Sequence, residues 1–483
     1  MRVYVVLRER SRRNRRNPSD FISLHCGPRS GFSVACEVHN DGSNLFMHKD
    51  LMNSSLREDP MKAILSCIFS AVLFGTASLS AAGERENRTH KHHFPATGEI
   101  DVMTQNQYLG ADLGPVLAAA ISDPSNMNAA VVDSLSKIAE SRPTERVRTL
   151  AEQIAQRNPD VVGLQEAYKF ECVPDTEHGF PPVMGKGCDD LAIKAAFTDH
   201  LKDTVEALEE LGSKYVVAGR VTNLKVDEIP FTVNNYSALL SIADRDVILV
   251  RADLSAEWVN FARVGLCPKP SDQGCNYQAA PPPLEVEIPD RDPEKPPIKI
   301  TIALVRGFLA VDVTIKGRVY RVFNTHLEQR LLAEGLTDTR LFQVRQASEL
   351  VDIALGTWDG SKKMIIVGDI NSDPRDRFLV PPPPPSPHLT PYEMFTFNNL
   401  FRDTWTLRYH HRPGLTCCQT EDLGNHRSEL YERIDMIFSH TPPLRVLDME
   451  LIGEKKRDKT DPPPKGGLWP SDHAALAATL QFK

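Results

Sequence analysis

Short apolar runs recur from residue 98 to the C-terminus, and they restrict the fold more than any other feature of the chain. Most are rich in β-branched and aromatic residues and are bounded by polar or turn-forming residues, which is typical of strands. The runs occupy residues 100–106, 161–166, 214–221, 246–251, 298–315, 318–327, 364–371, 433–439 and 473–482. A chain with this many separated strands must bury them in one or more sheets.

Three helical patterns separate several of these runs. In residues 144–159 the apolar side chains recur at helical spacing, and the pattern stops before Pro159. Residues 190–212, closed by Gly212, and residues 339–356 show the same periodicity. Strands interleaved with helices, together with neighbouring strands that read as hairpins, predict an α/β sandwich with mixed sheets.

The first 97 residues differ in composition from the rest. Residues 1–60 are basic at their start and show no sustained periodicity, whereas residues 61–82 combine a lysine, an apolar stretch and a small-residue cleavage site. That combination is typical of a secretory signal peptide, so we interpret Met61 as the natural first residue and residues 1–60 as a mis-assigned or disordered extension. The alternative is a basic cytoplasmic tail followed by a membrane anchor. Residues 83–97 read as a flexible leader, and the protein is expected to be periplasmic or extracellular.

Residues 98–483 show no second linker and no change of composition, which predicts one large domain. Residues 83–483 carry 45 Lys and Arg against 57 Asp and Glu, a net charge of −12. Avid, sequence-blind binding of nucleic acid depends on neutralising phosphates with Lys and Arg, so this acidic balance disfavours it. A local basic cleft stays compatible with the balance.

Six cysteines lie beyond residue 82, and four of them form two close pairs in polar loops. The pairs are Cys172 with Cys188 and Cys267 with Cys275. We predict a local disulfide in each pair, as expected in an oxidising compartment. Cys417 and Cys418 are adjacent and read either as a vicinal disulfide or as free thiols. Zinc is the competing interpretation, but the sequence has no Cys-x-x-Cys pair or nearby histidine cluster to support it.

The run at residues 364–371 ends in residues that can bind both metal and phosphate. Met364–Val367 reads as a buried strand, Gly368 permits a tight exit, and Asp369 and Asn371 follow. A carboxylate and an amide side by side can bind a hard cation and a phosphate oxygen. Taken alone, the stretch is better explained as a turn, because Asp, Asn and Gly are common turn residues.

The same chemistry recurs at other strand ends, and this repetition argues against a separate turn at each one. The further candidates are Asn106, Glu166, His326, Asp435, Asp472 and His473. Individually, an Asn can cap a turn, a buried His can be a satisfied core residue, and a Gln-Glu pair can simply be solvated. Together they indicate one site.

In this order, and with "GDIN", "RIDMIF" and "SDH" at residues 368–371, 433–438 and 471–473, the chain resembles the endonuclease/exonuclease/phosphatase superfamily. Members include deoxyribonuclease I, abasic-site endonucleases, inositol polyphosphate 5-phosphatases and neutral sphingomyelinases. The resemblance spans about residues 98 to 483. It implies that this segment is a catalytic domain with a four-layer α/β sandwich, in which two mixed β-sheets pack face to face with helices outside.

The resemblance also implies a metal site at one edge of the sheets. Glu166 would be the principal Mg²⁺ ligand, with Asn106 and Asp472 completing or supporting the site and with Mn²⁺ or Ca²⁺ as alternative ions. Asp369 would orient or deprotonate the attacking water, and Asn371 would hold the phosphate. Gln105 and Gln107, which flank Asn106, depart from the commoner Tyr and Val, so the phosphate contacts there stay open.

Two histidines complete the implied site. His473 would contact the scissile phosphate while Asp435 fixes its tautomer, and His326 matches the second histidine of the nuclease, lipase and phosphatase branches. Asp244 is a candidate partner for His326, although an ion pair of Asp244 with Arg245 or Arg251 explains it equally well.

Hydrolysis of a phosphodiester places negative charge on phosphate and leaving-group oxygens, which a divalent cation and an imidazolium can offset. The sequence therefore predicts an exported, Mg²⁺-dependent phosphodiester hydrolase, acting as a monomer without a stable protein partner on nucleic acid or on a phospholipid head group. The alternative is a non-catalytic member of the same fold that binds a phosphorylated ligand or serves as a scaffold. Such a member would have lost at least one candidate residue, and none is lost.

Overall fold

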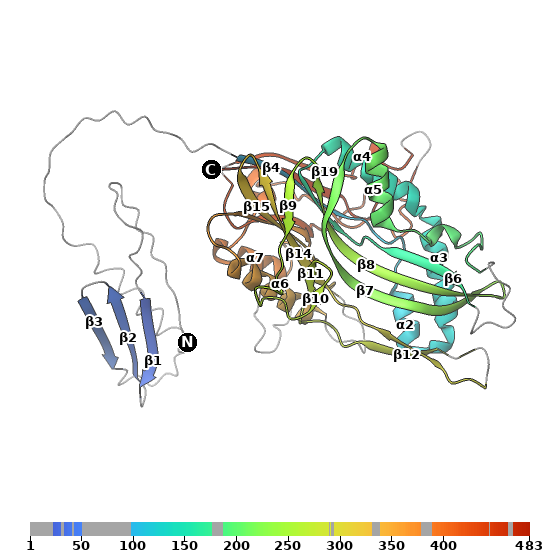
Figure 1. Cartoon of the computed structure of the whole chain (residues 1–483), viewed down its shortest axis with the longest axis horizontal. Helices are drawn as coiled ribbons and strands as arrows, with labels where there is room; N and C mark the ends of the chain where they lie inside the picture. The colour runs from blue at the N-terminus through green and yellow to red at the C-terminus, as the bar shows by residue number, and fades with distance from the viewer. Residues whose placement is uncertain are drawn as a thin grey trace. The chain divides into compact units, whose positions relative to one another are not determined.

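The computed structural model forms two compact units, Met1–His92 and His93–Lys483 (Figure 1). It describes residues 98–175, 187–288, 290, 294–330, 339–377, 389–443, 445–461 and 467–483, and upstream of these the backbone of three strands. Those strands, β1 (Ser23–Arg29), β2 (Ser33–Asn40) and β3 (Ser43–Asp50), pair antiparallel in one sheet. The signal peptide expected at residues 61–82 and the leader at 83–97 lie outside the described residues, and the interpretation of Met61 as the first residue stays a prediction.

Two large sheets form the body of the downstream unit. The first has seven strands in the order β19-β20-β4-β5-β8-β6, with β7 paired to β8. Its strands are β4 (Gly98–Asn106), β5 (Val161–Gln165), β6 (Lys169–Pro174), β7 (Tyr215–Val233), β8 (Tyr236–Arg251), β19 (Arg445–Ile452) and β20 (Ala475–Phe482). Within it β4 and β5 run parallel and the other neighbours antiparallel, so the sheet is mixed.

The second sheet has eight strands in the order β10-β11-β14-β15-β16-β18-β17, with β9 paired to β14. Its strands are β9 (Ser255–Trp258), β10 (Pro270–Ser271), β11 (Gly274–Asn276), β14 (Gly307–Ile315), β15 (Arg318–His326), β16 (Lys363–Asp369), β17 (Arg402–Asp403) and β18 (Asp435–Ser439). Here β15 and β16 are the parallel pair, so this sheet is also mixed.

The sheets pack face to face, with one helical layer outside each. The core between them combines side chains of both, such as Val102 and Ile248 from the first sheet and Val322 and Val367 from the second. Helices α4 (Pro143–Arg157) and α5 (His200–Glu210) pack on the first sheet, and α6 (Arg340–Gly356) and α7 (Pro391–Thr396) pack on the second (Figure 1). The predicted four-layer α/β sandwich is therefore confirmed.

Other elements extend this body. The long hairpin of β7 and β8 packs against α2 (Gly114–Ser122), α3 (Met127–Glu140) and the two-stranded pair β12 (Leu284–Ile288) and β13 (Ile298–Ile302). Helix α8 (Thr404–Arg408) follows β17. Within the described part of the chain, none of the helices has the length and hydropathy needed to cross a bilayer.

The predicted helices differ in how well their bounds match. Helix α6 occupies almost all of the predicted 339–356, whereas the pattern at 190–212 forms an α-helix only at His200–Glu210. The cause is Asp199, whose carboxylate accepts a hydrogen bond from the amide of Lys202 and so begins the helix there. Upstream of it, Lys194–Ala196 forms a short 3₁₀ turn.

Candidate functional site

The candidate residues lie at the ends of central strands in both sheets. Asn106, His326 and Asp369 are the last residues of their strands, Asp435 is the first of β18, Glu166 directly follows β5, and Asp472 and His473 precede β20. The register places Asp369 opposite both His326 and Asp435. Adjacent pairing therefore brings residues that are far apart in the sequence together at one edge.

Gly368 allows this convergence at the end of β16. Its φ of +147° is a conformation that L side chains rarely adopt, and a Cβ atom there would collide with the backbone carbonyl of Thr325 on β15. The backbone thus approaches its neighbour closely just before Asp369. This is the physical reason for the abrupt Gly-Asp ending noted in the sequence.

His473 and Asp435 form a buried ion pair. The Nδ1 atom of His473 lies 2.8 Å from Oδ2 of Asp435, and its Nε2 atom lies 3.9 Å from carboxylate oxygens of both Asp369 and Asp472. Burial alone would lower the pKa of His473, but Asp435 and the other carboxylates outweigh it and raise that pKa well above its ordinary value. His473 is therefore a cation at neutral pH.

Asn106 joins carboxylates from the two sheets. Its Nδ2 atom donates to Oε1 of Glu166 and to Oδ2 of Asp369, at 3.2 Å each. Its Oδ1 atom accepts a hydrogen bond from the amide of Tyr108 at 2.9 Å. In this arrangement the amide nitrogen faces the carboxylates, and the role of Asn106 as a metal ligand stays a prediction.

Glu166 and Asp472 are like charges held near one another in a buried environment. Desolvation raises the pKa of both carboxyls, and Asp472 contributes to the rise at Glu166. The amide of Leu109 donates to Oε2 of Glu166 at 3.2 Å, which fixes the side chain. Two carboxylates whose charges act on each other offer hard oxygen donors that fit a divalent cation, because the ion would offset their repulsion.

The Asp369 carboxyl has a pKa close to neutral pH. Burial and the neighbouring Asp435 raise its pKa to about 7, although His473 opposes the rise. The amide of Asn371 donates to its Oδ1 atom at 2.9 Å, which orients the carboxylate. At neutral pH the group is poised to take up a proton.

His326 differs from His473 in charge. Its Nδ1 atom lies 3.1 Å from Nη1 of Arg306, and burial together with the Arg306 charge lowers the pKa of His326 well below its ordinary value. Because a guanidinium only donates, Nδ1 must accept, and the proton of the neutral ring is on Nε2. Nε2 lies 3.1 Å from Nδ2 of Asn371, which is also a donor, so this contact is not a hydrogen bond in that tautomer; Oδ2 of Asp369 lies 3.6 Å from Nε2.

Arg306 thus occupies the place next to His326 for which Asp244 is a candidate from the sequence. Arg306 lies 3.8 Å from Asp244, and Arg245 and Arg251 pair instead with Asp199 and Asp160. Neither sequence interpretation of Asp244 is therefore correct. Arg306 was missed because it lies within residues 298–315, which read as one continuous strand but break into β13 and β14 on either side of it.

A loop with two adjacent cysteines holds the residues around His473. The Thr416 hydroxyl accepts hydrogen bonds from the amides of Ile434 and Asp435 at 3.1 Å, and the amide of Gln419 donates to the carbonyl of Asp472 at 2.9 Å. Between them, Cys417 pairs with His473 through an isolated β-bridge. The loop is therefore tied by its own backbone and hydroxyl to both sides of the site.

All three cysteine pairs are disulfide-bonded. The predicted Cys172–Cys188 and Cys267–Cys275 bridges are confirmed, and the question left open at Cys417 and Cys418 resolves as a vicinal disulfide. The sulfur atoms of this last bridge lie within 4.8 Å of a ring nitrogen of His473. Nothing in the sequence indicates this proximity.

Arg146 braces the other side of the site entirely through backbone carbonyls. The side chain is fully buried in α4 and donates to the carbonyls of Ser141, Gln107, Pro470 and Tyr108 at 3.0 to 3.2 Å. The carbonyls of Gln107 and Tyr108 follow Asn106, and that of Pro470 precedes Asp472. Arg146 therefore fixes the spacing of two candidate metal ligands without contacting either side chain.

Comparison with known proteins gives structural matches only. The chain is similar to an endonuclease/exonuclease/phosphatase from Beutenbergia cavernae DSM 12333, at 17% identity, 80% coverage of this chain, 72% of that chain and a TM-score of 0.40. A family protein from Bacteroides thetaiotaomicron matches at 17% identity, 80% and 99% coverage and a TM-score of 0.41. Danio rerio TDP2 complexed with a single-strand DNA product matches at 14% identity, 79% and 98% coverage and a TM-score of 0.37.

The first two structures carry the name of the superfamily that the sequence motifs resemble. No family model and no curated protein matches the chain.

Proposed function

We propose that this protein is a divalent-metal-dependent phosphodiester hydrolase of the endonuclease/exonuclease/phosphatase type. The observation that carries the proposal is the arrangement around Asp369. Nε2 of the protonated His473 lies 3.9 Å from its Oδ2 atom, and Nε2 of the neutral His326 lies 3.6 Å from the same oxygen. Attack by water on a phosphate needs a base to accept the water's proton and donors to stabilise the phosphate oxygens. The Asp369 carboxylate is the base, and His473 and His326 are the charged and the neutral donor.

Each of the site residues has a separate role in this proposed reaction. Glu166 and Asp472 would hold the cation, which when bound supplies positive charge to the phosphate oxygens. Asp369 accepts the proton of the attacking water, since its pKa of about 7 makes it an effective base at neutral pH. His473 stabilises the negative charge that develops on the phosphate, and Asp435 keeps the ring protonated and oriented.

His326 and Asn371 position the substrate instead of transferring a proton. Nδ2 of Asn371 donates to the carbonyl of Leu327 at 2.9 Å, which fixes the amide beside the imidazole. The two side chains offer hydrogen bonds to one phosphate oxygen. Because His326 is neutral, its hydrogen bond orients the phosphate without adding a positive charge to the site.

The substrate class and the compartment belong to the same proposal. Three disulfide bridges favour an oxidising compartment, as expected after export. The substrate is a phosphodiester in nucleic acid or in a phospholipid head group. The protein is proposed to act as a monomer, which sedimentation would test.

The test is hydrolysis by the purified full chain of plasmid DNA, RNA, sphingomyelin and a chromogenic phosphodiester, each with Mg²⁺ and with excess EDTA. We expect turnover of at least one substrate with Mg²⁺ and none with EDTA. Glu166→Gln should lower it at least about a hundredfold, because a lost ligand charge weakens both cation binding and phosphate polarisation. Glu171→Gln, an exposed carboxylate on the neighbouring β6, is the matched control and should keep full activity. Undiminished turnover in EDTA would contradict the proposal.

A further inference from the structure

Two further carboxylates are buried between the sheets, outside the residues described so far as the candidate site. Asp244 and Asp246 alternate along β8 and therefore point to the same face, where their side chains are almost wholly buried. Asn223 of the paired strand β7 is equally buried. The register of the two strands shifts between Thr222 and Leu224, so Asn223 is the extra residue of a β-bulge. Bulges commonly re-aim a side chain toward a functional position.

The polar atoms of this group lack partners. In the described part of the chain, neither oxygen of Asp246, nor Oδ1 of Asp244, nor either polar atom of the Asn223 amide makes a hydrogen bond. The Asn223 amide acts on both carboxylates as a hydrogen-bonding neighbour that favours their charged forms, but no contact within the group reaches full hydrogen-bond geometry. Four of these five atoms are oxygens, gathered in one buried place. Buried polar groups without partners are rare in folded proteins and indicate that something else satisfies them.

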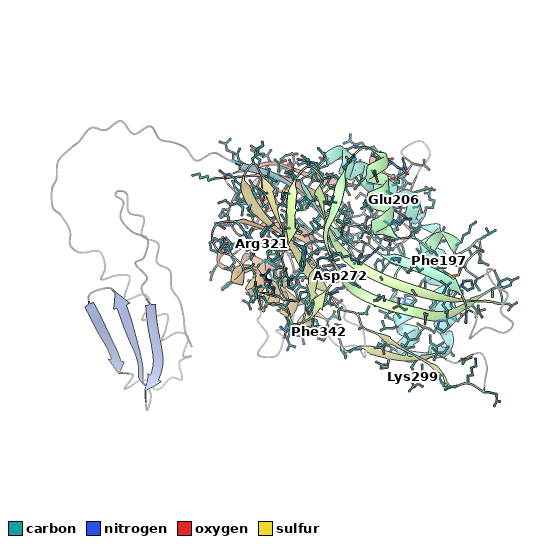
Figure 2. All side chains as sticks on the ribbon, in the orientation of Figure 1. Phe197, Glu206, Asp272, Lys299, Arg321 and Phe342 are labelled. Atoms are coloured by element: carbon teal, nitrogen blue, oxygen red, sulfur yellow. A yellow bond between two sulfur atoms is a disulfide. The ribbon has the colours of Figure 1, made fainter. Side chains whose placement is uncertain are left out.

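A neighbouring carboxylate shows the contrast. Asp272, labelled in Figure 2, lies close to the same hairpin, and both of its oxygens are paired. Oδ1 lies 3.3 Å from Nε of Arg220, and Oδ2 accepts a hydrogen bond from the Thr222 hydroxyl at 2.6 Å. The lack of partners at Asp246 is therefore a property of that position and not of the region.

The charges in the group do not balance. Arg306 is the nearest cation, at 3.8 Å from Asp244 and 3.6 Å from Glu328, and its closest contact is His326. Arg245 also acts on Asp244 but is paired with Asp199, so the carboxylates of Asp244, Asp246 and Glu328 in their charged forms would share the one guanidinium of Arg306. Burial raises the pKa of Asp244 to about 7 and that of Asp246 well above its ordinary value, which shows how costly these charges are without compensation.

We propose that Asp244, Asp246 and Asn223 bind a second hard divalent cation, separate from the one at Glu166 and Asp472. The donors are all oxygens, and their charge matches that of one such ion. Ca²⁺ fits best, because it accepts irregular sets of oxygen ligands completed by water, whereas Mg²⁺ requires near-octahedral geometry and zinc prefers nitrogen or sulfur. The inference does not depend on the proposed hydrolase function.

The test measures Ca²⁺ binding by calorimetry on the full chain carrying Asp472→Asn, which weakens the other cation site and leaves this group intact. We expect about one Ca²⁺ per chain to bind, and its affinity to fall at least about tenfold when Asp246→Asn is added. Asp227→Asn removes an exposed carboxylate from the same hairpin and is the matched control, expected to leave the affinity unchanged. In parallel, Ca²⁺ should raise the melting temperature of the Asp472→Asn chain and not that of the double variant.

Two results would overturn the proposal. One is that the Asp472→Asn chain binds no Ca²⁺; the other is that Asp246→Asn leaves the affinity as it was. Either would mean that the carboxyls are held neutral by protons. If Asp246→Asn does not fold, Asn223→Ala removes a ligand oxygen without changing the charge, and the same two criteria apply to it.

Discussion

Nδ1 of His473 lies 2.8 Å from Oδ2 of Asp435, and both side chains are buried. The contact joins the first residue of β18 to the loop before β20, and therefore links the two sheets. Oδ1 of Asp435 makes no hydrogen bond within the described residues, so the imidazole is the principal partner of the carboxylate. The charge of His473 depends on this one pair more than on any other contact.

Asp435→Asn should therefore lower the pKa of His473. The ring then loses its proton at lower pH, so the alkaline limb of the pH–rate profile should move to lower pH. Turnover should fall at least about a hundredfold at neutral pH, the scale of one lost transition-state donor. An NMR titration of His473 together with the rate profile measures both effects. Asp448→Asn, an exposed carboxylate on β19, is the control. A His473 pKa that does not move in Asp435→Asn would contradict the assignment.

Arg306→Met should raise the pKa of His326. The charge of Arg306 is one of the causes that hold this pKa down, so its removal makes protonation easier. Arg306→Lys keeps the charge and should leave the pKa nearly unchanged. An NMR titration of His326 in the two variants separates the effect of the Arg306 charge from that of its shape. Equal pKa values in both would show that the Arg306 charge does not keep the ring neutral.

His200 should make the protein sensitive to acid. Burial, with Arg146 and Arg245 nearby, lowers the pKa of His200 to about 3, while the unfolded chain keeps the ordinary value. Below about pH 6.5, His200 therefore binds a proton in the unfolded state but stays neutral in the native state. Its contribution to stability is fully present above that pH and is lost as the pH falls toward 3. Between pH 7.5 and pH 5 the loss from this group is about 2 kcal/mol.

Denaturant unfolding at the two pH values measures this loss, and His200→Phe should reduce the difference by a similar amount. His411→Phe, at an exposed histidine, is the control and should leave the difference as it is. An unchanged difference in His200→Phe would show that other groups cause the acid sensitivity.

Thr416→Val should destabilise the fold and the site together. The hydroxyl accepts from two buried backbone amides, and valine of similar shape leaves both amides without an acceptor. The expected loss is about 1 to 3 kcal/mol of unfolding free energy. Thr416→Ser keeps the acceptor and should retain most of the stability, as urea unfolding would show. If serine and valine destabilise equally, the methyl group and not the hydroxyl is what matters.

The parts of the site that sequence could predict are those at strand ends. Asp369 and His326 could be predicted because a polar residue directly after an apolar run lies at the edge of a sheet, whatever the tertiary structure. Arg306 could not, because the apolar residues around it hide the break between β13 and β14. Thr416 acts through a hydroxyl bonded to backbone amides, and nothing in the sequence says which loop will pass beside Asp435. Only tertiary structure brings such groups together.

Arg146 directs all of its hydrogen bonds to carbonyl oxygens, so the positions it contacts tolerate substitution unequally. The carbonyls of Gln107 and Pro470 would be offered by almost any residue that keeps the same backbone path, whereas no other side chain supplies the planar fork of donors that reaches four carbonyls at once. During divergence, the residues beside the candidate ligands can therefore drift in identity while the arginine one helix away cannot.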